Sequence, residues 1–280
     1  MPGNYATADD GGLIFYQDWG PREAQPIVFH HGWPLSSDDW EAQMRFFFDH
    51  GYRVIAHDRR GHGRSPQAGQ VHDVDRHAAD AATVSTLLDL RDAVHVGHGT
   101  GGGEVARYVA RYGQPQGRVA KAVLIGAMTA PPASHARRTS RLPARLLEGI
   151  RAGLAGDRAQ LFVELASGPF YGFNRPGTQI QPGIVGHWIR QALMGSAQAQ
   201  HDGLLAFSEA DHGADLEAID VPVLVMHGDD DQVVPLAGAA LRAVSLLRHG
   251  TLQVYAGAPH GLHTTHADAV NQDLLAFIRA

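Results

Sequence analysis

Short apolar runs alternate with longer amphipathic stretches over the first 130 residues of the chain. The runs are rich in β-branched residues and end near glycine or proline, which is typical of strands in a sheet buried on both faces. Helices are expected between them at 37–48, with Ser37 as a candidate N-cap, and at 72–88. Strands that alternate with helices predict an α/β fold with a doubly wound, mostly parallel sheet. The expected strands of this part of the chain are 13–16, 26–30, 53–57, 93–96 and 122–127.

This alternation stops at Thr129 and resumes near residue 218. No buried strand is expected in between, where the chain carries basic, proline-punctuated and helical stretches. Because such a long excursion inside an α/β domain is usually functional, we expect residues 129–217 to form a helical lid. Residues 1–128 and 218–280 are expected to form the α/β core, with two further strands and a final amphipathic helix at 221–227, 250–255 and 267–279.

Composition narrows the class of protein. The 280 residues are 44% apolar, enough for a large core in one α/β domain. The net charge of −6, without a basic stripe, argues against nucleic acid as a partner. The absence of cysteine excludes disulfides, thiol catalysis and thiolate metal sites. Residues 1–5 lack the pattern of a signal peptide, and no apolar run reaches the about 18 residues of a membrane span, so we expect a cytoplasmic protein without a membrane partner.

A glycine-rich turn follows the strand expected at 93–96. Residues 97–103 read Gly-His-Gly-Thr-Gly-Gly-Gly, and a helix is expected from residue 102 to about residue 112. A strand, a sharp glycine-flanked turn and a helix together form the nucleophile elbow, G-x-S-x-G. The central position, where the serine should stand, is Gly99. The pattern therefore predicts a nucleophile site that lacks its nucleophile.

The same glycines also fit a dinucleotide-binding pattern. Gly97, Gly99 and Gly102 match G-x-G-x-x-G. That fingerprint normally follows the first strand of its domain, with an acidic residue about 20 positions further on. Here the turn lies nearly a hundred residues into the chain, and the strand at 122–127 ends without an acid. The elbow is therefore favoured, and no nicotinamide cofactor is expected.

Three further segments place catalytic residue types directly after expected strands. The segment 30–34 can supply one backbone N–H of an oxyanion hole, and Thr100, which follows the nucleophile position, would supply the other. The segment 227–235 offers a carboxylate that could orient a histidine, and His260 follows the last strand as a candidate base. The chain order of nucleophile position, acid and histidine is that of α/β-hydrolases.

Segments spread over almost the whole chain carry a closer likeness: 31–35, 56–65, 101–108, 166–172 and the motifs around Asp231 and His260. In these segments the chain resembles the non-haem haloperoxidase and arylesterase (perhydrolase) branch of the α/β-hydrolases. At the elbow, only the serine departs from that family's pattern.

The resemblance implies a role for each candidate site residue. Asp231, four residues before Pro235, would be the triad acid, with Asp229 and Asp230 as alternatives in register. His260 would be the base, and the N–H groups of Trp33 and Thr100 would form the oxyanion hole. Trp33 is also a candidate for contact with substrate, as are three residues for which core or lid packing is the alternative, namely Met128, Phe162 and Phe170.

The resemblance also implies a reaction and its partners. The expected substrates are small esters, lactones or carboxylic acids, and Pro34 after Trp33 favours hydrogen peroxide as a co-substrate. No metal, haem or other cofactor is implied, and family members often self-associate into homo-oligomers. His260, His263 and His266 recur every three residues, but without a carboxylate at metal-ligand spacing they do not predict a metal site. The segment 58–65 is expected to form a turn and an ion pair, and His30 and His98 are expected to be structural.

Glycine at the elbow changes what this scaffold is able to do. The elbow forces a positive φ on its central residue, which glycine adopts with little strain, whereas loss of the hydroxyl prevents covalent acyl transfer. A replaced serine and a natural variant both fit a chain that retains Asp231 and His260. Two competing functions stay open, a ligand-binding pseudo-hydrolase and a catalyst that depends on histidine alone, such as a lyase or cofactor-free oxygenase.

Overall fold

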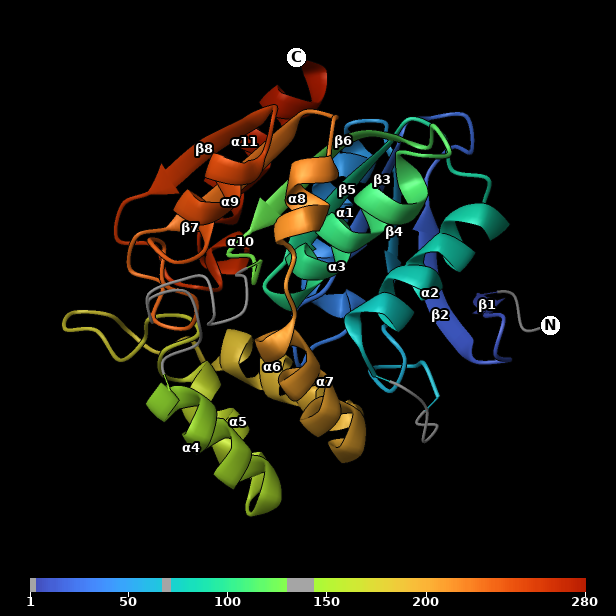
Figure 1. The fold of residues 1–280 in the computed structure, drawn as a ribbon. Coiled ribbons are helices and arrows are strands. Elements are labelled where there is room, and N and C mark those ends of the chain that lie inside the picture. The colour runs from blue at the N-terminus through green and yellow to red at the C-terminus, as the bar shows by residue number, and fades with distance from the viewer. Residues whose placement is uncertain (1–3, 67–71, 130–143) are drawn as a thin grey trace.

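An eight-stranded sheet runs through the centre of the computed structural model, which describes residues 4–66, 72–129 and 144–280 (Figure 1). The strand order is β1-β2-β4-β3-β5-β6-β7-β8. The six strands from β4 to β8 in this order are parallel, whereas β1 and β2 add an antiparallel edge. The expectation of a doubly wound, mostly parallel sheet is confirmed. The strands are β1 Tyr5–Thr7, β2 Leu13–Trp19, β3 Pro26–His30, β4 Arg53–His57, β5 Ala93–His98, β6 Val119–Ile125, β7 Val223–Gly228 and β8 Gly250–Tyr255.

Helices cover both faces of the sheet. On one face, α1 (Glu41–Asp49) and α11 (Ala267–Arg279) bury Phe47 and Leu274 against the strands. On the other face lie α2 (Val74–Leu87), α3 (Thr100–Tyr108), α8 (Gly213–Ala218) and α9 (Ala240–Leu246). The central strands β3, β4 and β5 are fully buried, as their continuous apolar runs predicted. A short helix, α10 (Leu262–Thr265), precedes α11.

Four helices lie together beyond one end of the sheet, in the lower part of Figure 1. They are α4 (Ala144–Ala155), α5 (Arg158–Ala166), α6 (Pro182–Met194) and α7 (Ala197–Glu209), and they belong to the segment expected as a lid. Their apolar faces share one cluster, to which the loop after β3 contributes Leu35. The last helix before β7, α8, instead packs against α3. Residues 130–143, the first part of the expected lid, lie outside the described residues.

Several element boundaries differ from those expected. The helix expected at 37–48 begins as a 3-10 turn, Ser37–Trp40, and Ser36 caps it by accepting the Asp38 N–H at 3.4 Å. The expectation of Ser37 as N-cap is wrong, because its hydroxyl donates to the buried Asp58 Oδ1 at 2.6 Å instead. The helix after the elbow starts two residues earlier than expected, at Thr100, and ends in a π-helical turn, Val109–Gly113.

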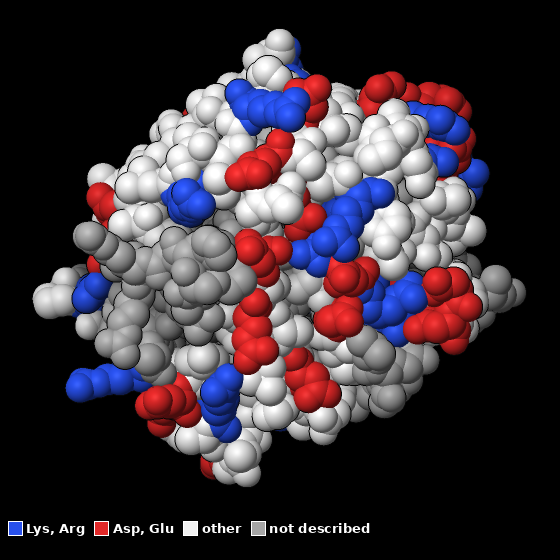
Figure 2. All heavy atoms as spheres, viewed as in Figure 1, with Lys and Arg blue, Asp and Glu red and all other residues white. Residues whose placement is uncertain are grey.

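Charges of both signs are interspersed on the face shown in Figure 2, and no basic stripe gathers among the described residues there. Within the described ranges, no helix combines the length and apolar character needed to cross a membrane.

Candidate active site

The turn between β5 and α3 has the geometry of an elbow centred on Gly99. Gly99 adopts φ +55° and ψ −118°, and its N–H donates to Ile125 O at 3.0 Å. The flanking glycines are required by close packing: a Cβ on Gly97 would lie 2.3 Å from Gly101 O, and one on Gly101 would lie 2.2 Å from His30 O. Position 99 differs, because a Cβ there would lie 3.3 Å from His260 Nε2 and 3.9 Å from Gly32 Cα. A side chain at this position would therefore face the His260 ring.

His260 is held by Asp231 at the carboxyl ends of neighbouring strands. Its Nδ1 lies 2.8 Å from Asp231 Oδ2. The other oxygen, Oδ1, accepts the N–H groups of Val233 at 2.9 Å and Val234 at 2.7 Å. Because the carboxylate accepts on both oxygens, Nδ1 of His260 is the nitrogen that carries the proton, and Nε2 is left with a lone pair facing Gly99.

The Asp231 carboxylate is fixed in its charged form. Burial by itself would raise the pKa of Asp231, but the neighbouring rings of His260 and His227, with their hydrogen bonds, outweigh burial and lower the pKa to about 2. His227 Nε2 lies 3.4 Å from Asp231 Oδ2 and donates to Val234 O at 2.8 Å. The acid of this pair is thus ionised over the whole range in which a histidine base operates.

Asp229 and Asp230, which precede Asp231 in the chain, bind other partners. Asp230 pairs with Arg175, whose Nε lies 2.7 Å from Asp230 Oδ2 near the surface. Asp229 Oδ1 accepts the Gly257 N–H at 2.6 Å. Of these three carboxylates, all within the described residues, Asp231 is the one that contacts His260.

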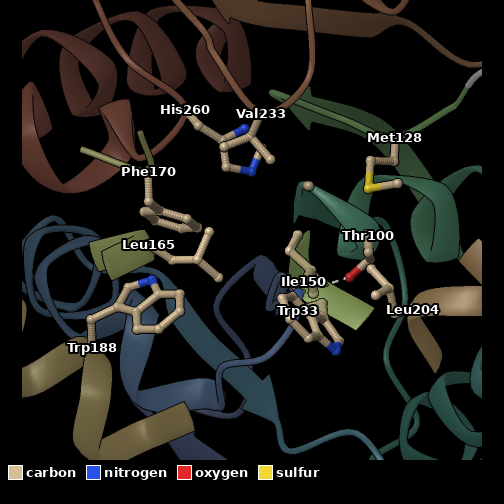
Figure 3. A pocket seen from close by; sticks show the side chains of 11 residues that line it. Trp33, Thr100, Met128, Ile150, Leu165, Phe170, Trp188, Leu204, Val233 and His260 are labelled. Carbon is tan, nitrogen blue, oxygen red and sulfur yellow. Dashed lines mark hydrogen bonds between the residues drawn. The ribbon is translucent and has the colours of Figure 1, made fainter. Parts of the chain in front are cut away.

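The two backbone N–H groups expected as oxyanion donors, those of Trp33 and Thr100, lie close together, but their hydrogen bonding differs. The Trp33 N–H donates to Thr100 Oγ1 at 2.9 Å, so this donor is already engaged (Figure 3). The Thr100 N–H is at the first position of α3, where a backbone donor has no partner within its own helix and the positive end of the helix dipole favours an anion. The Trp33 indole is anchored separately, since its Nε1 donates to Gln200 O at 2.9 Å.

A buried ionic cluster lies behind these donors. Glu104 of α3 accepts from His30 Nδ1 at 2.7 Å, His57 Nε2 at 2.9 Å and Arg59 Nε at 2.9 Å. Burial alone would raise the pKa of Glu104, but the Arg59 charge, with the two histidines, holds it well below its usual value. Sequence reasoning expected the segment of Arg59 to form a turn and an ion pair, but it did not identify Glu104 as the partner. The available signal was a glutamate on a helix whose other residues near the elbow are small or apolar.

A small apolar cavity opens onto Gly99, Thr100 and His260 (Figure 3). Three expected contact residues, Trp33, Met128 and Phe170, line it. Phe162 does not; it is fully buried and packs edge-on against the rings of Trp33 and Trp188, with centroid distances of 6.2 and 5.7 Å. The lining residues that sequence reasoning missed are Ile150, Leu165, Trp188, Leu204 and Val233, mostly from α4 to α7.

The histidines at intervals of three do not converge. His263 Nε2 lies 2.9 Å from Asp39 Oδ2, whereas His266 is exposed. Two groups of described residues bring metal-ligating atoms within 4.8 Å of one another: His30, His57 and Glu104, and Asp39, His98 and His263. In both groups the carboxylate already accepts hydrogen bonds from histidine, and in the first the Arg59 guanidinium would also repel a cation.

The chain is similar to known proteins over its full length. Residues 25–267 match the family described as "alpha/beta hydrolase fold". A non-heme chloroperoxidase from Burkholderia pyrrocinia is 57% identical over 276 residues, which cover 99% of each chain. A bifunctional esterase/perhydrolase from Acinetobacter calcoaceticus is 51% identical over 276 residues, again 99% of each. The crystal structure of a bromoperoxidase from Bacillus anthracis superimposes with a TM-score of 0.90 at 32% identity and covers 99% of both chains.

Proposed function

The chain belongs to the alpha/beta hydrolase family, in its non-haem haloperoxidase branch, and on that premise we propose what its site does. The site is a scaffold for hydrolysis of small esters and lactones and for peroxide-dependent formation of peracids, and Gly99 impairs its covalent route. One observation carries this proposal: His260 contacts both Asp231 and position 99, with 2.8 Å from its Nδ1 to Asp231 Oδ2 and 3.3 Å from its Nε2 to a Cβ at position 99.

With a serine at position 99, the site has the parts of an acyl-transfer triad. His260 Nε2 would take the hydroxyl proton as the oxygen attacks the acyl carbon, and Asp231 would stabilise the resulting imidazolium. The alcohol would leave with that proton, and water or hydrogen peroxide would then release the acid or the peracid. The esterase/perhydrolase relative, named for both reactions, supports both acceptors for this scaffold.

With glycine at position 99, no acyl-enzyme forms there, but His260 retains its lone pair on the cavity side. We propose a direct route in which His260 acts as general base on a water or peroxide molecule that attacks the substrate carbonyl. One C–O bond forms, the bond to the leaving alcohol breaks, and His260 returns the proton to that alcohol. Such a remnant of a triad retains about 10³–10⁴-fold catalysis over water in comparable enzymes.

The cavity supports small, mainly apolar acyl groups as substrates. Apart from Thr100 and His260 its side chains are apolar, and Phe170 and Trp188 form one wall with their ring centroids 5.2 Å apart. The polar groups lie at one end, beside Gly99. A substrate would place its carbonyl at that end and its apolar part against the aromatic wall.

The test compares the chain with Gly99→Ser on p-nitrophenyl acetate, with and without hydrogen peroxide, and follows acyl adducts by mass spectrometry. We expect Gly99→Ser to be faster by at least about 10³-fold and to carry a transient acyl group. Equal rates in the two proteins would refute the triad assignment. Ligand binding without turnover in either protein would favour the pseudo-hydrolase. A reaction lost in His260→Ala but not improved by serine would favour the histidine-only catalyst.

A further inference from the structure

The hydroxyl of Thr100 occupies a position where an oxyanion hole normally presents a backbone donor. Its Oγ1 accepts the Trp33 N–H at 2.9 Å, so this N–H is directed at a neighbouring side chain and not into the cavity. Backbone donors of an oxyanion hole act by pointing at the site where negative charge develops. Either the hydroxyl blocks one donor of the site, or the hydroxyl is itself the donor.

A second hydrogen bond decides how the hydroxyl is oriented. Arg59 Nη1 donates to the same Thr100 Oγ1 at 3.2 Å. A hydroxyl oxygen has two lone pairs and one proton, and the Trp33 N–H and Arg59 together occupy both lone pairs. The described residues offer the Thr100 proton no acceptor of their own. Because Thr100 lines the cavity beside Gly99 and His260, we expect this proton to find its acceptor in a molecule bound in the cavity.

The Arg59 charge makes this hydroxyl a stronger donor than an isolated one. The guanidinium is 2% exposed and is held in place by Glu104 Oε2 at 2.9 Å and by His31 O at 3.0 Å. A buried cation that donates to a hydroxyl oxygen polarises the O–H bond, and hydrogen bonds in such a chain strengthen one another. Glu104 compensates the charge, so that the arrangement is stable without a ligand.

We propose that the Thr100 side-chain hydroxyl, polarised by Arg59, is an oxyanion donor of this site. It would act beside the Thr100 N–H at the start of α3, while the Trp33 N–H positions the hydroxyl and does not contact substrate. When a nucleophile attacks the acyl carbon, the carbonyl π electrons move to the oxygen, which accepts the Thr100 O–H hydrogen bond without proton transfer. Arg59 and Glu104 are positioning residues. This inference rests on the proposed function and names the group that would stabilise its intermediate.

The experiment uses Gly99→Ser as its active reference, with Thr100→Val and Thr100→Ser added to it. Valine keeps the shape of threonine, removes the hydroxyl and frees the Trp33 N–H, so the two explanations predict opposite signs. Loss of one oxyanion donor lowers kcat by about 10²–10³-fold in comparable enzymes. Since the freed N–H replaces part of that donor, we expect Thr100→Val to lower kcat at least about tenfold with KM little changed. Thr100→Ser should stay within about threefold of the reference.

A control variant, an inhibition constant and a second substitution at position 100 separate the effect of the hydroxyl from a loss of folding. Thr83→Val on α2 is the matched control, because its hydroxyl donates to Ala79 O at 3.1 Å within its own helix and is not part of the site. The inhibition constant of phenylboronic acid, which forms a tetrahedral adduct with the serine, should rise in Thr100→Val in parallel with the fall in kcat/KM. If valine perturbs the fold, Thr100→Ala, which also removes the hydroxyl, should still lower kcat relative to the reference.

A kcat in Thr100→Val equal to or above that of the reference would overturn the proposal and leave the esterase function intact. An inactive Gly99→Ser would instead refute the proposed function. In that case the role of the Thr100 hydroxyl is tested without turnover, through the affinity of the Gly99 protein for phenylphosphonate. An affinity weakened about tenfold or more by Thr100→Val and retained by Thr100→Ser supports the donor, and an unchanged affinity refutes it.

Discussion

Serine at position 99 should raise activity and lower stability in the same protein. Gly99 has φ +55°, a conformation that residues with a side chain adopt only under strain. The space is tight at one point, because a Cβ would lie 3.3 Å from His260 Nε2 and the ring must shift by a few tenths of an ångström, whereas the nearest backbone atom is Gly32 Cα at 3.9 Å. The destabilisation should therefore come mainly from backbone strain, with a smaller contribution from the shift of the His260 ring.

The expected magnitude follows from two opposing contributions. Strain at a positive φ costs about 1–3 kcal/mol, and the smaller conformational freedom of serine in the unfolded chain offsets about 0.4–1 kcal/mol of it. The net loss is about 0.5–2 kcal/mol in the free energy of unfolding. For a chain of this length, about 2 °C of Tm corresponds to 1 kcal/mol, so the Tm should fall by about 1–4 °C.

Gly99→Ala is the matched control because it carries the same strain without a hydroxyl. Thermal unfolding should show the same fall in Tm for Gly99→Ala and Gly99→Ser, whereas hydrolysis of p-nitrophenyl acetate should rise at least about 10³-fold only in Gly99→Ser. A higher Tm in both variants would show that the turn is not strained. Equal activity of the two variants would show that the hydroxyl is not the nucleophile.

Three further predictions follow from the site and its surroundings. In the Gly99→Ser background, Asp231→Asn should lower kcat by about 10⁴-fold because the histidine tautomer is no longer fixed, whereas the surface variant Asp230→Asn should change it little; a large loss in Asp230→Asn would place the acid elsewhere. Leu204→Ala should enlarge the cavity and raise kcat/KM for p-nitrophenyl butyrate relative to acetate, and an unchanged ratio would show that α7 does not limit the acyl group. Burial lowers the pKa of His62 to about 3 and lowers that of several other histidines well below the usual value, so the unfolded chain takes up protons first as the pH falls below about 6.5. Urea unfolding should therefore show full stability above that pH and a loss that begins near pH 6.5 and continues to about pH 3, the pKa of His62 in the folded protein. A flat profile would contradict the burial of these rings: His31, His62, His77, His95 and His98.

Local patterns were sufficient to predict most of the strands and the order of the segments expected to be catalytic. The apolar runs placed β3, β4 and β5 to within two residues, because a strand buried on both faces leaves a continuous signal in a few consecutive residues. The elbow was visible for the same reason: its close backbone contacts require glycine at positions 97 and 101, only a few residues apart. The ends of parallel strands meet at one edge of the sheet, which is why motifs at the ends of β5, β7 and β8 pointed to one site.

The contacts between distant segments were decided by the tertiary structure alone. The sequence gives Phe162 and Trp188 the same apolar character, and only the packing of α5 against α6 places the first behind the cavity wall and the second in it. The bond from the Trp33 N–H to the Thr100 hydroxyl joins residues 67 positions apart, and Glu104 meets Arg59 across 45 positions. No periodicity or motif encodes such pairs, because each depends on side-chain directions fixed only after the sheet has assembled. The sequence therefore determined the parts of the candidate site and their order, whereas three-dimensional packing determined which side chains line the cavity and which donors are already engaged.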